Sequence, residues 1–157
     1  MFTACFVGQR FCKLDRITYN GIKFNAKYAI TVNHVTEFLV GNLCKFDNVA
    51  ASVIRSLKKD YPHIKLYLVV PEVTRKVLRQ ENEYDKILVH KVPKSRFCTA
   101  KKIYEYMIDE SELVISYVEK AIGHLAQAER YAKKNKKIYD IFVTAYPIRS
   151  VNRKQTF

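Results

Sequence analysis

Several small polar clusters in this sequence follow apolar runs, and their residue types suit binding of a phosphate or a ribose. Gly8, Gln9 and Arg10 come directly after the apolar run that begins at Phe2 and ends at Val7. Glycine permits a tight turn and a close approach of the backbone to a ligand. Arginine presents a planar fork of donors that can hold a phosphate in a bidentate contact. The same stretch is also compatible with an ordinary strand end that carries a surface arginine.

Further candidates follow two other apolar runs. Gly41 and Asn42 end the run Thr36–Val40, whereas Gly123 and His124 lie a few residues beyond Leu113–Tyr117, which contains Ser116. A neutral histidine could bind a base or a ribose, and a protonated one could face a phosphate. Asp47 could bind ribose hydroxyls, cap the helix that follows it, or do both. Glycines are common in strand-to-helix turns without any ligand, so each cluster alone is a weak signal.

The elements that would position these residues alternate along the chain. Apolar runs predict strands at Phe2–Val7, Thr36–Val40, Ile64–Val70, Lys86–His90, Leu113–Tyr117 and Ile138–Val143. Helical spacing or capping residues predict helices within Tyr19–Asn33, after Asp47 or Asn48, at Glu72–Gln80, at Thr99–Asp109 and around Ala121–Ala132. This alternation predicts an α/β fold with a mostly parallel sheet covered by helices on both faces. The glycines would then meet at the carboxyl edge of that sheet, where helix N-termini favour anions.

Composition sets wider limits. The 157 residues suit a single domain, 1–143, followed by a basic tail, 144–157. No run is long enough for a membrane span and no signal peptide is visible, so we expect no membrane partner. The formal net charge of +13 favours an anionic partner, although a solvated basic surface is the plainer explanation. The four cysteines form no CxxC pair, which argues against a zinc site or a disulfide framework and favours reduced thiols in the cytoplasm. We expect no metal and no cofactor.

Five segments in order resemble one known family. TACFVGQR resembles the opening T-x-C-F-T-G-H-R of the small YpsA-like proteins of the SLOG superfamily. LVGNLCKFDNVAA (Leu39–Ala51) is similar to S-G-G-A-x-G-F-D-x-x-A-A, and YPHIKLYLVVP (Tyr61–Pro71) resembles the family's third strand with its proline. YMIDESELVISY (Tyr106–Tyr117) and AIGHLAQAERYAKKNKKI (Ala121–Ile138) resemble Y-M-V-D-x-S-D-x-L-I-A-Y and G-G-T-A-x-x-x-x-Y-A-x-x-x-x-K-x-I. The resemblance extends to about Phe142.

This resemblance implies a Rossmann-like, doubly wound domain related to DNA-processing protein A and to the LOG phosphoribohydrolases. It implies a nucleotide pocket formed by Gly8, Gln9, Arg10, Gly41, Asn42, Asp47, Pro71, Ser116, Gly123 and His124. Several positions depart from the family: Gln9 replaces its histidine, Asn42 and Ile122 each replace one glycine of a pair, and His124 replaces a threonine. The pocket backbone is similar while its ligand contacts differ, so a shared substrate does not follow.

Three functional hypotheses remain. The first is binding of a small anionic, nucleotide-derived signalling ligand without catalysis, for sensing or for sequestration, as in a phage protein that removes a host immune signal. The second is nucleic-acid binding, favoured by the charge, by Lys91, Lys94 and Arg96, and by the basic tail. The third is nucleotide hydrolysis, weakened because IGHLAQAE lacks the P-G-G-x-G-T-x-x-E signature and Glu129 is displaced from its glutamate. The resemblance also implies a homo-oligomer in a bacterial or phage-infected cytoplasm.

Overall fold

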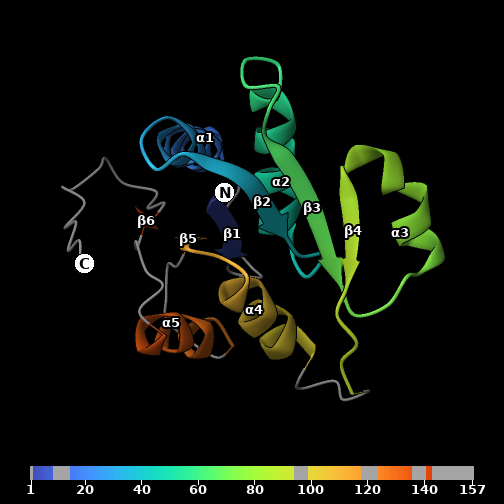
Figure 1. Ribbon diagram of the computed structural model, residues 1–157. Coiled ribbons are helices and arrows are strands. Elements are labelled where there is room, and N and C mark those ends of the chain that lie inside the picture. The colour runs from blue at the N-terminus through green and yellow to red at the C-terminus, as the bar shows by residue number, and fades with distance from the viewer. Residues whose placement is uncertain (1, 9–14, 94–98, 118–123, 136–140, 143–157) are drawn as a thin grey trace.

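A computed structural model describes residues 2–8, 15–93, 99–117, 124–135 and 141–142 of the chain (Figure 1). The strands are β1 (Phe2–Gly8), β2 (Val35–Val40), β3 (Lys65–Val70), β4 (Lys86–Val89), β5 (Leu113–Tyr117) and β6 (Ile141–Phe142). The helices are α1 (Arg16–Thr31), α2 (Lys45–Leu57), α3 (Arg75–Arg79), α4 (Thr99–Asp109) and α5 (His124–Lys134), with a short 3₁₀ turn η1 (Glu81–Glu83). Strands and helices alternate, as the sequence predicts.

All the described strands belong to one parallel sheet, in the order β4-β3-β2-β1-β5-β6. The chain moves outward from β1 to β4 and then crosses to the other side of β1 to form β5. This reversal of strand order beside a central strand is the mark of a doubly wound sheet. The predicted α/β, Rossmann-like fold is therefore confirmed.

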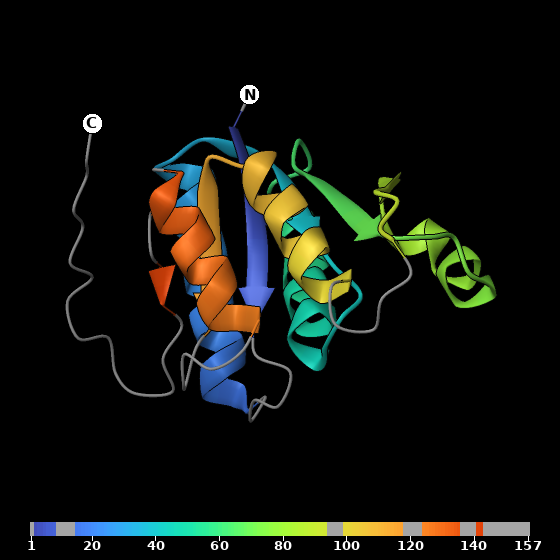
Figure 2. The same ribbon diagram turned by 90° about the horizontal axis from the view of Figure 1, so that it is seen from below.

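Helices cover both faces of the sheet. Apolar side chains of α1, α2 and α3 form one core with Phe6, Phe38 and Tyr117. Those of α4 and α5 form a second core with Cys5, Val7 and other strand residues on the opposite face. Figure 2 shows this order of layers, with α4 and α5 in front of the sheet and α1 and α2 behind it. No helix within the described ranges has the length and apolar character needed to cross a membrane.

Helix starts differ most from the predicted elements. Helix α2 begins at Lys45, before Asp47, because Cys44 occupies the N-cap and Asp47 bonds back from the third helical position. Helix α3 is shorter than predicted and begins after Thr74, whose Oγ1 accepts the N–H of Val77 at 3.3 Å. The last predicted strand, Ile138–Val143, is described only at Ile141–Phe142, and the tail 144–157 lies outside the described residues.

Candidate functional site

The carboxyl ends of β1 and β5 lie side by side and mark the switch point of the sheet. Gly8, the last residue of β1, pairs in register with Tyr117, the last residue of β5. The connection after β1 leads to α1 and β2, whereas the connection after β5 leads to α5 and β6. In open α/β sheets the crevice between two such diverging connections is the usual place for a ligand.

Gly8 is enclosed by the protein itself. A Cβ atom placed on Gly8 would lie 1.9 Å from Cδ1 of Phe46, a buried ring in the first turn of α2. The carbonyl of Gly8 accepts a hydrogen bond from the Tyr104 hydroxyl at 3.3 Å and faces the Cys44 thiol at 3.9 Å. The glycine is therefore required so that α2 can approach the end of β1, and this packing accounts for the residue without any ligand.

Asp47 organises the loop between β2 and α2. Its Oδ2 accepts the backbone N–H of Leu43 at 2.9 Å and that of Cys44 at 3.3 Å. A Cβ atom on Gly41 would lie 3.2 Å from the same oxygen, so a side chain at that position would crowd the carboxylate. Asp47 does cap α2, but it does so from the third helical position, and the predicted N-cap position belongs to Cys44.

The other oxygen of Asp47 has incomplete hydrogen bonding. Asp47 is 0% exposed, and no donor in the described part of the chain lies within bonding distance of Oδ1. Burial raises the pKa of this carboxyl to about 6, while the N–H groups of Leu43 and Cys44 act in the opposite direction. The group is thus charged at neutral pH. A buried charge with an unpaired oxygen is costly, so this atom offers an acceptor that a ligand hydroxyl or amine could satisfy.

The neighbouring titratable side chains are poor catalysts. Burial and the charge of Asp47 raise the pKa of the Cys44 thiol to about 12. Burial also raises the pKa of Tyr104 well above its ordinary value. Both groups are protonated at neutral pH and serve as donors to Gly8, which does not favour a role as nucleophile or base. Within the described ranges no group of three His, Cys, Asp or Glu side chains could hold a metal ion.

The structure separates the predicted site residues into three groups. Gly8, Gly41 and Asp47 come together beside the first turn of α2, with half-buried Asn42 in the same loop. Ser116 is buried within β5 opposite Val7, and Pro71 follows β3, two strands from β1 and thus about 10 Å along the edge. Gln9, Arg10 and Gly123 lie outside the described residues, as does the side chain of His124, whose backbone begins α5.

Three residues of this site do not stand out in the sequence: Cys44, Phe46 and Tyr104. The spacing of Cys44 and Asp47 is that of a capping box, with an N-cap residue three positions before an acidic one. This spacing is visible in the sequence and indicates that the helix begins after Cys44. Phe46 and Tyr104 resemble ordinary core residues. Their contacts with Gly8 join segments far apart in sequence, which helical periodicity does not reveal.

The segments that follow three of the strands in sequence are rich in basic residues. The segments after β1, β4 and β5 contain Arg10, Lys13, Lys91, Lys94, Arg96 and Lys120, with two acids, Asp15 and Glu119. The connections at the amino edge that enter β4 and β5 instead contain Glu81, Glu83, Asp85, Glu110 and Glu112. In sequence, the segments that follow β1, β4 and β5 are thus net basic, whereas the segments that precede β4 and β5 are acidic.

Comparison with models of known protein families and with curated protein sequences gives no match for this chain.

Proposed function

We propose that this protein binds a small, anionic, nucleotide-derived ligand at the carboxyl edge of the sheet, beside β1, and retains it without conversion. The proposal depends on the buried carboxylate of Asp47, which holds the 41–44 loop with one oxygen and whose other oxygen has no hydrogen-bond partner among the described residues. A ribose hydroxyl or a base amine is a donor that suits this atom.

The distribution of charge supports the anionic part of the ligand. A carboxylate alone would repel a phosphate, so a nucleotide needs separate positions for its sugar and its phosphate. Arg10 lies two residues after Gly8 along the chain, and the segments that follow β4 and β5 contain further bases, Lys91, Lys94, Arg96 and Lys120. In the proposed arrangement Arg10 pairs with the phosphate while Asp47 receives a hydroxyl or an amine.

Native mass spectrometry of the purified chain against nucleoside phosphates and cyclic signalling nucleotides tests the proposal. We expect stoichiometric binding of at least one compound that is recovered with unchanged mass after heat release. Arg10→Ala should weaken binding by at least about tenfold. Arg130→Ala removes one exposed cation from α5, away from the 41–44 loop, and serves as the matched control with unchanged affinity.

Two other results would overturn the proposal. Recovery of a converted ligand would identify an enzyme, and Asp47→Asn should then abolish turnover if its carboxylate acts on the substrate. Retention of oligonucleotides alone, steeply weakened by salt, would identify nucleic-acid binding through the basic surface.

A further inference from the structure

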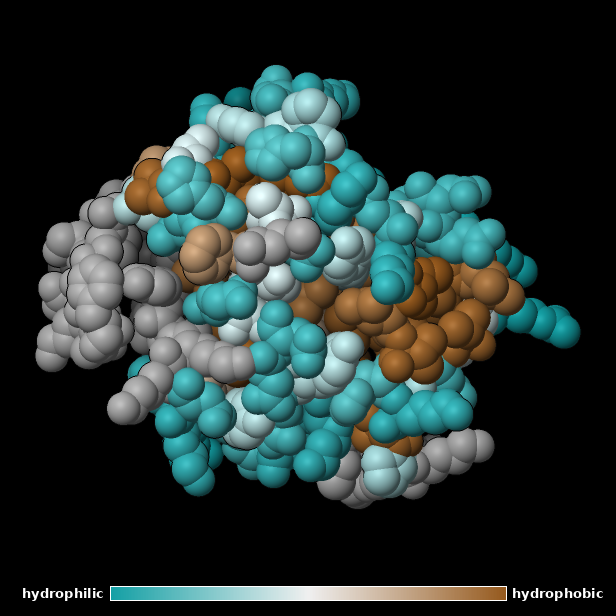
Figure 3. Space-filling model, viewed as in Figure 1, coloured by the Kyte–Doolittle hydropathy of each residue, from teal (hydrophilic) through white to brown (hydrophobic). Residues whose placement is uncertain are grey.

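An apolar surface lies at the outer edge of the sheet, away from the candidate site beside β1. Val73, Leu78 and Val89 are 49%, 52% and 47% exposed, and they belong to the loop before α3, to α3 and to β4. Figure 3 shows a continuous brown area over α3 and β4, surrounded by hydrophilic residues. We refer to these three residues, together with the charged side chains of α3 and η1, as the α3–β4 surface. A contiguous apolar area with a polar rim is typical of a protein interface.

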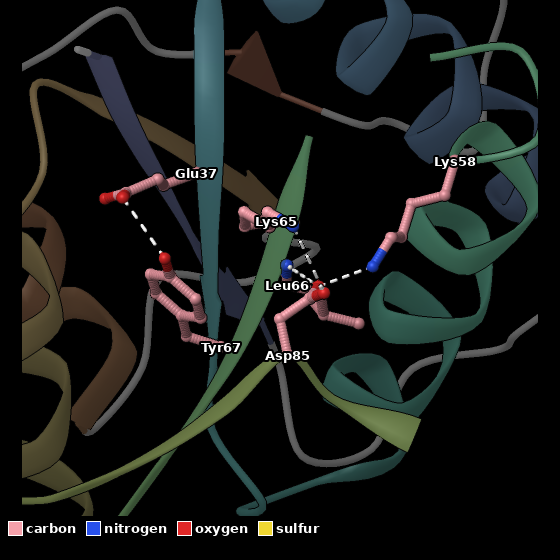
Figure 4. Close-up of polar contacts among 6 residues, drawn as sticks. All are labelled: Glu37, Lys58, Lys65, Leu66, Tyr67 and Asp85. Carbon is pink, nitrogen blue, oxygen red and sulfur yellow. Dashed lines mark hydrogen bonds and ion pairs between the residues drawn. The ribbon is translucent and has the colours of Figure 1, made fainter. Parts of the chain in front are cut away.

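This surface is built on a firmly held edge strand. Asp85, directly before β4, forms two hydrogen bonds with the backbone of Leu66 in β3. Its N–H donates to the Leu66 carbonyl at 2.8 Å, and its side-chain carboxylate accepts the Leu66 N–H at 2.8 Å. Lys58 of α2 forms an ion pair with the same carboxylate (Figure 4). These contacts fix β4 to the rest of the sheet, so the exposed side of β4 has a defined position relative to the core.

The charge of this surface favours a second copy of the chain over an acidic partner. Although the protein carries +13, acids and bases are balanced between residues 72 and 89. The bases are Arg75, Lys76, Arg79 and Lys86, and the acids are Glu72, Glu81, Glu83 and Asp85. Two copies can therefore meet at this surface without the repulsion that the net charge of +13 imposes elsewhere on average.

The positive and negative side chains of this surface also lie in separate, adjacent segments. Helix α3 carries the exposed Arg75, Lys76 and Arg79, which form no salt bridge within the described part of the chain. The next turn, η1, carries Glu81, likewise exposed and outside those salt bridges. A surface with adjacent positive and negative halves is self-complementary about a two-fold axis, as an isologous dimer requires.

We propose that the α3–β4 surface is the interface of a homodimer with two-fold symmetry. Val73, Leu78 and Val89 form its apolar centre, and α3 of each copy faces η1 of the other. The proposal is independent of ligand binding, because its readout is mass.

Sedimentation equilibrium over a wide range of protein concentration tests it. We expect a species with twice the 18.4 kDa mass of the chain. Leu78→Lys and Val89→Lys should each weaken dimerisation by about tenfold or more, since each places an amine in the apolar centre. Phe24→Lys is the matched control, because Phe24 is 55% exposed on α1 and lies outside this surface. Circular dichroism confirms that each variant is folded.

A charge exchange supplies the decisive second measurement. Arg79→Glu and Glu81→Lys should each weaken the dimer, and an equimolar mixture of the two variants should restore it as a heterodimer. The proposal is overturned if the wild-type chain stays at 18.4 kDa at every concentration. It is also overturned if Phe24→Lys dissociates a dimer that Leu78→Lys and Val89→Lys leave intact.

Discussion

Gly8 and Phe46 are in such close contact that no side chain fits between them. The ring of Phe46 occupies the position that a Cβ of Gly8 would need, with Cδ1 at 1.9 Å and Cγ at 2.1 Å. Phe46 also packs against Phe6 and Tyr117, so it cannot withdraw without disturbing the core beneath the site. The first turn of α2 is thereby fixed against the ends of β1 and β5.

Gly8→Ala should destabilise the protein by about 2 kcal/mol or more, because the added methyl group overpacks a filled core. Urea unfolding monitored by circular dichroism measures the loss. Gly41→Ala serves as a milder comparison and should lower the free energy of unfolding by less than half as much. Its Cβ would lie 3.2 Å from a carboxylate oxygen of Asp47, which can shift slightly.

A double-mutant cycle identifies the cause of the Gly8 effect. Phe46→Ala alone should cost about 3 kcal/mol through the cavity that it leaves. In that background Gly8→Ala should cost much less than in the wild-type protein, since the ring that it meets is gone. Additive effects of the two substitutions would show that Gly8 is required for a backbone reason and not for this contact.

The sequence predicts the sheet well because most strands are short apolar runs. Leu113–Tyr117 is predicted with the bounds that the structure has, since every residue of that run is buried on both faces of a parallel sheet. The start of α2 is predicted too late because a cysteine N-cap is a weak signal. The strand order and the hydrogen bond from Tyr104 to Gly8 depend on contacts between distant segments, which local patterns do not specify.

Asp47 should make stability fall as pH rises from about 4 to about 6. Its pKa of about 6 in the folded protein lies above the value of 3.8 expected when unfolded, so the folded state holds the proton more tightly. That advantage is complete below the unfolded pKa and is lost as pH rises through the folded one. The difference corresponds to roughly 3 kcal/mol.

Asp47→Asn isolates this contribution from the other carboxyl groups. The variant cannot ionise at this position, so its stability relative to wild type should improve steadily between pH 4 and pH 6 and then level off. Urea unfolding at a series of pH values measures the difference. A constant difference across this range would show that the carboxyl of Asp47 has an ordinary pKa.

Cys44 should resist alkylation in the folded protein. A thiol whose pKa is raised to about 12 forms almost no thiolate at pH 8, and only the thiolate reacts. Iodoacetamide labelling followed by peptide mass mapping should find Cys44 and the buried Cys5 unmodified in native protein and modified in urea. Rapid native labelling of Cys44 would mean that the thiol is more accessible or more acidic than this site implies.

Asp85 should stabilise the edge strand through two separable contributions, a hydrogen bond and a charge. Asp85→Ala removes the acceptor for the Leu66 N–H and should cost about 2 kcal/mol, whereas Asp85→Asn keeps an acceptor oxygen and should cost about 0.5 kcal/mol at pH 7.

The pKa of Asp85 lies below its ordinary value. Burial opposes this shift, which comes from the Lys58 contact, the Leu66 N–H and the charge of Lys65. The charge therefore stabilises the fold above the unfolded pKa and loses its effect as pH falls through the folded one. In urea unfolding, the free energies of unfolding of wild type and Asp85→Asn should converge at acidic pH, while that of Asp85→Ala stays lower. If both variants lose the same free energy of unfolding at pH 7, the charge of Asp85, and not its hydrogen bond, holds β4.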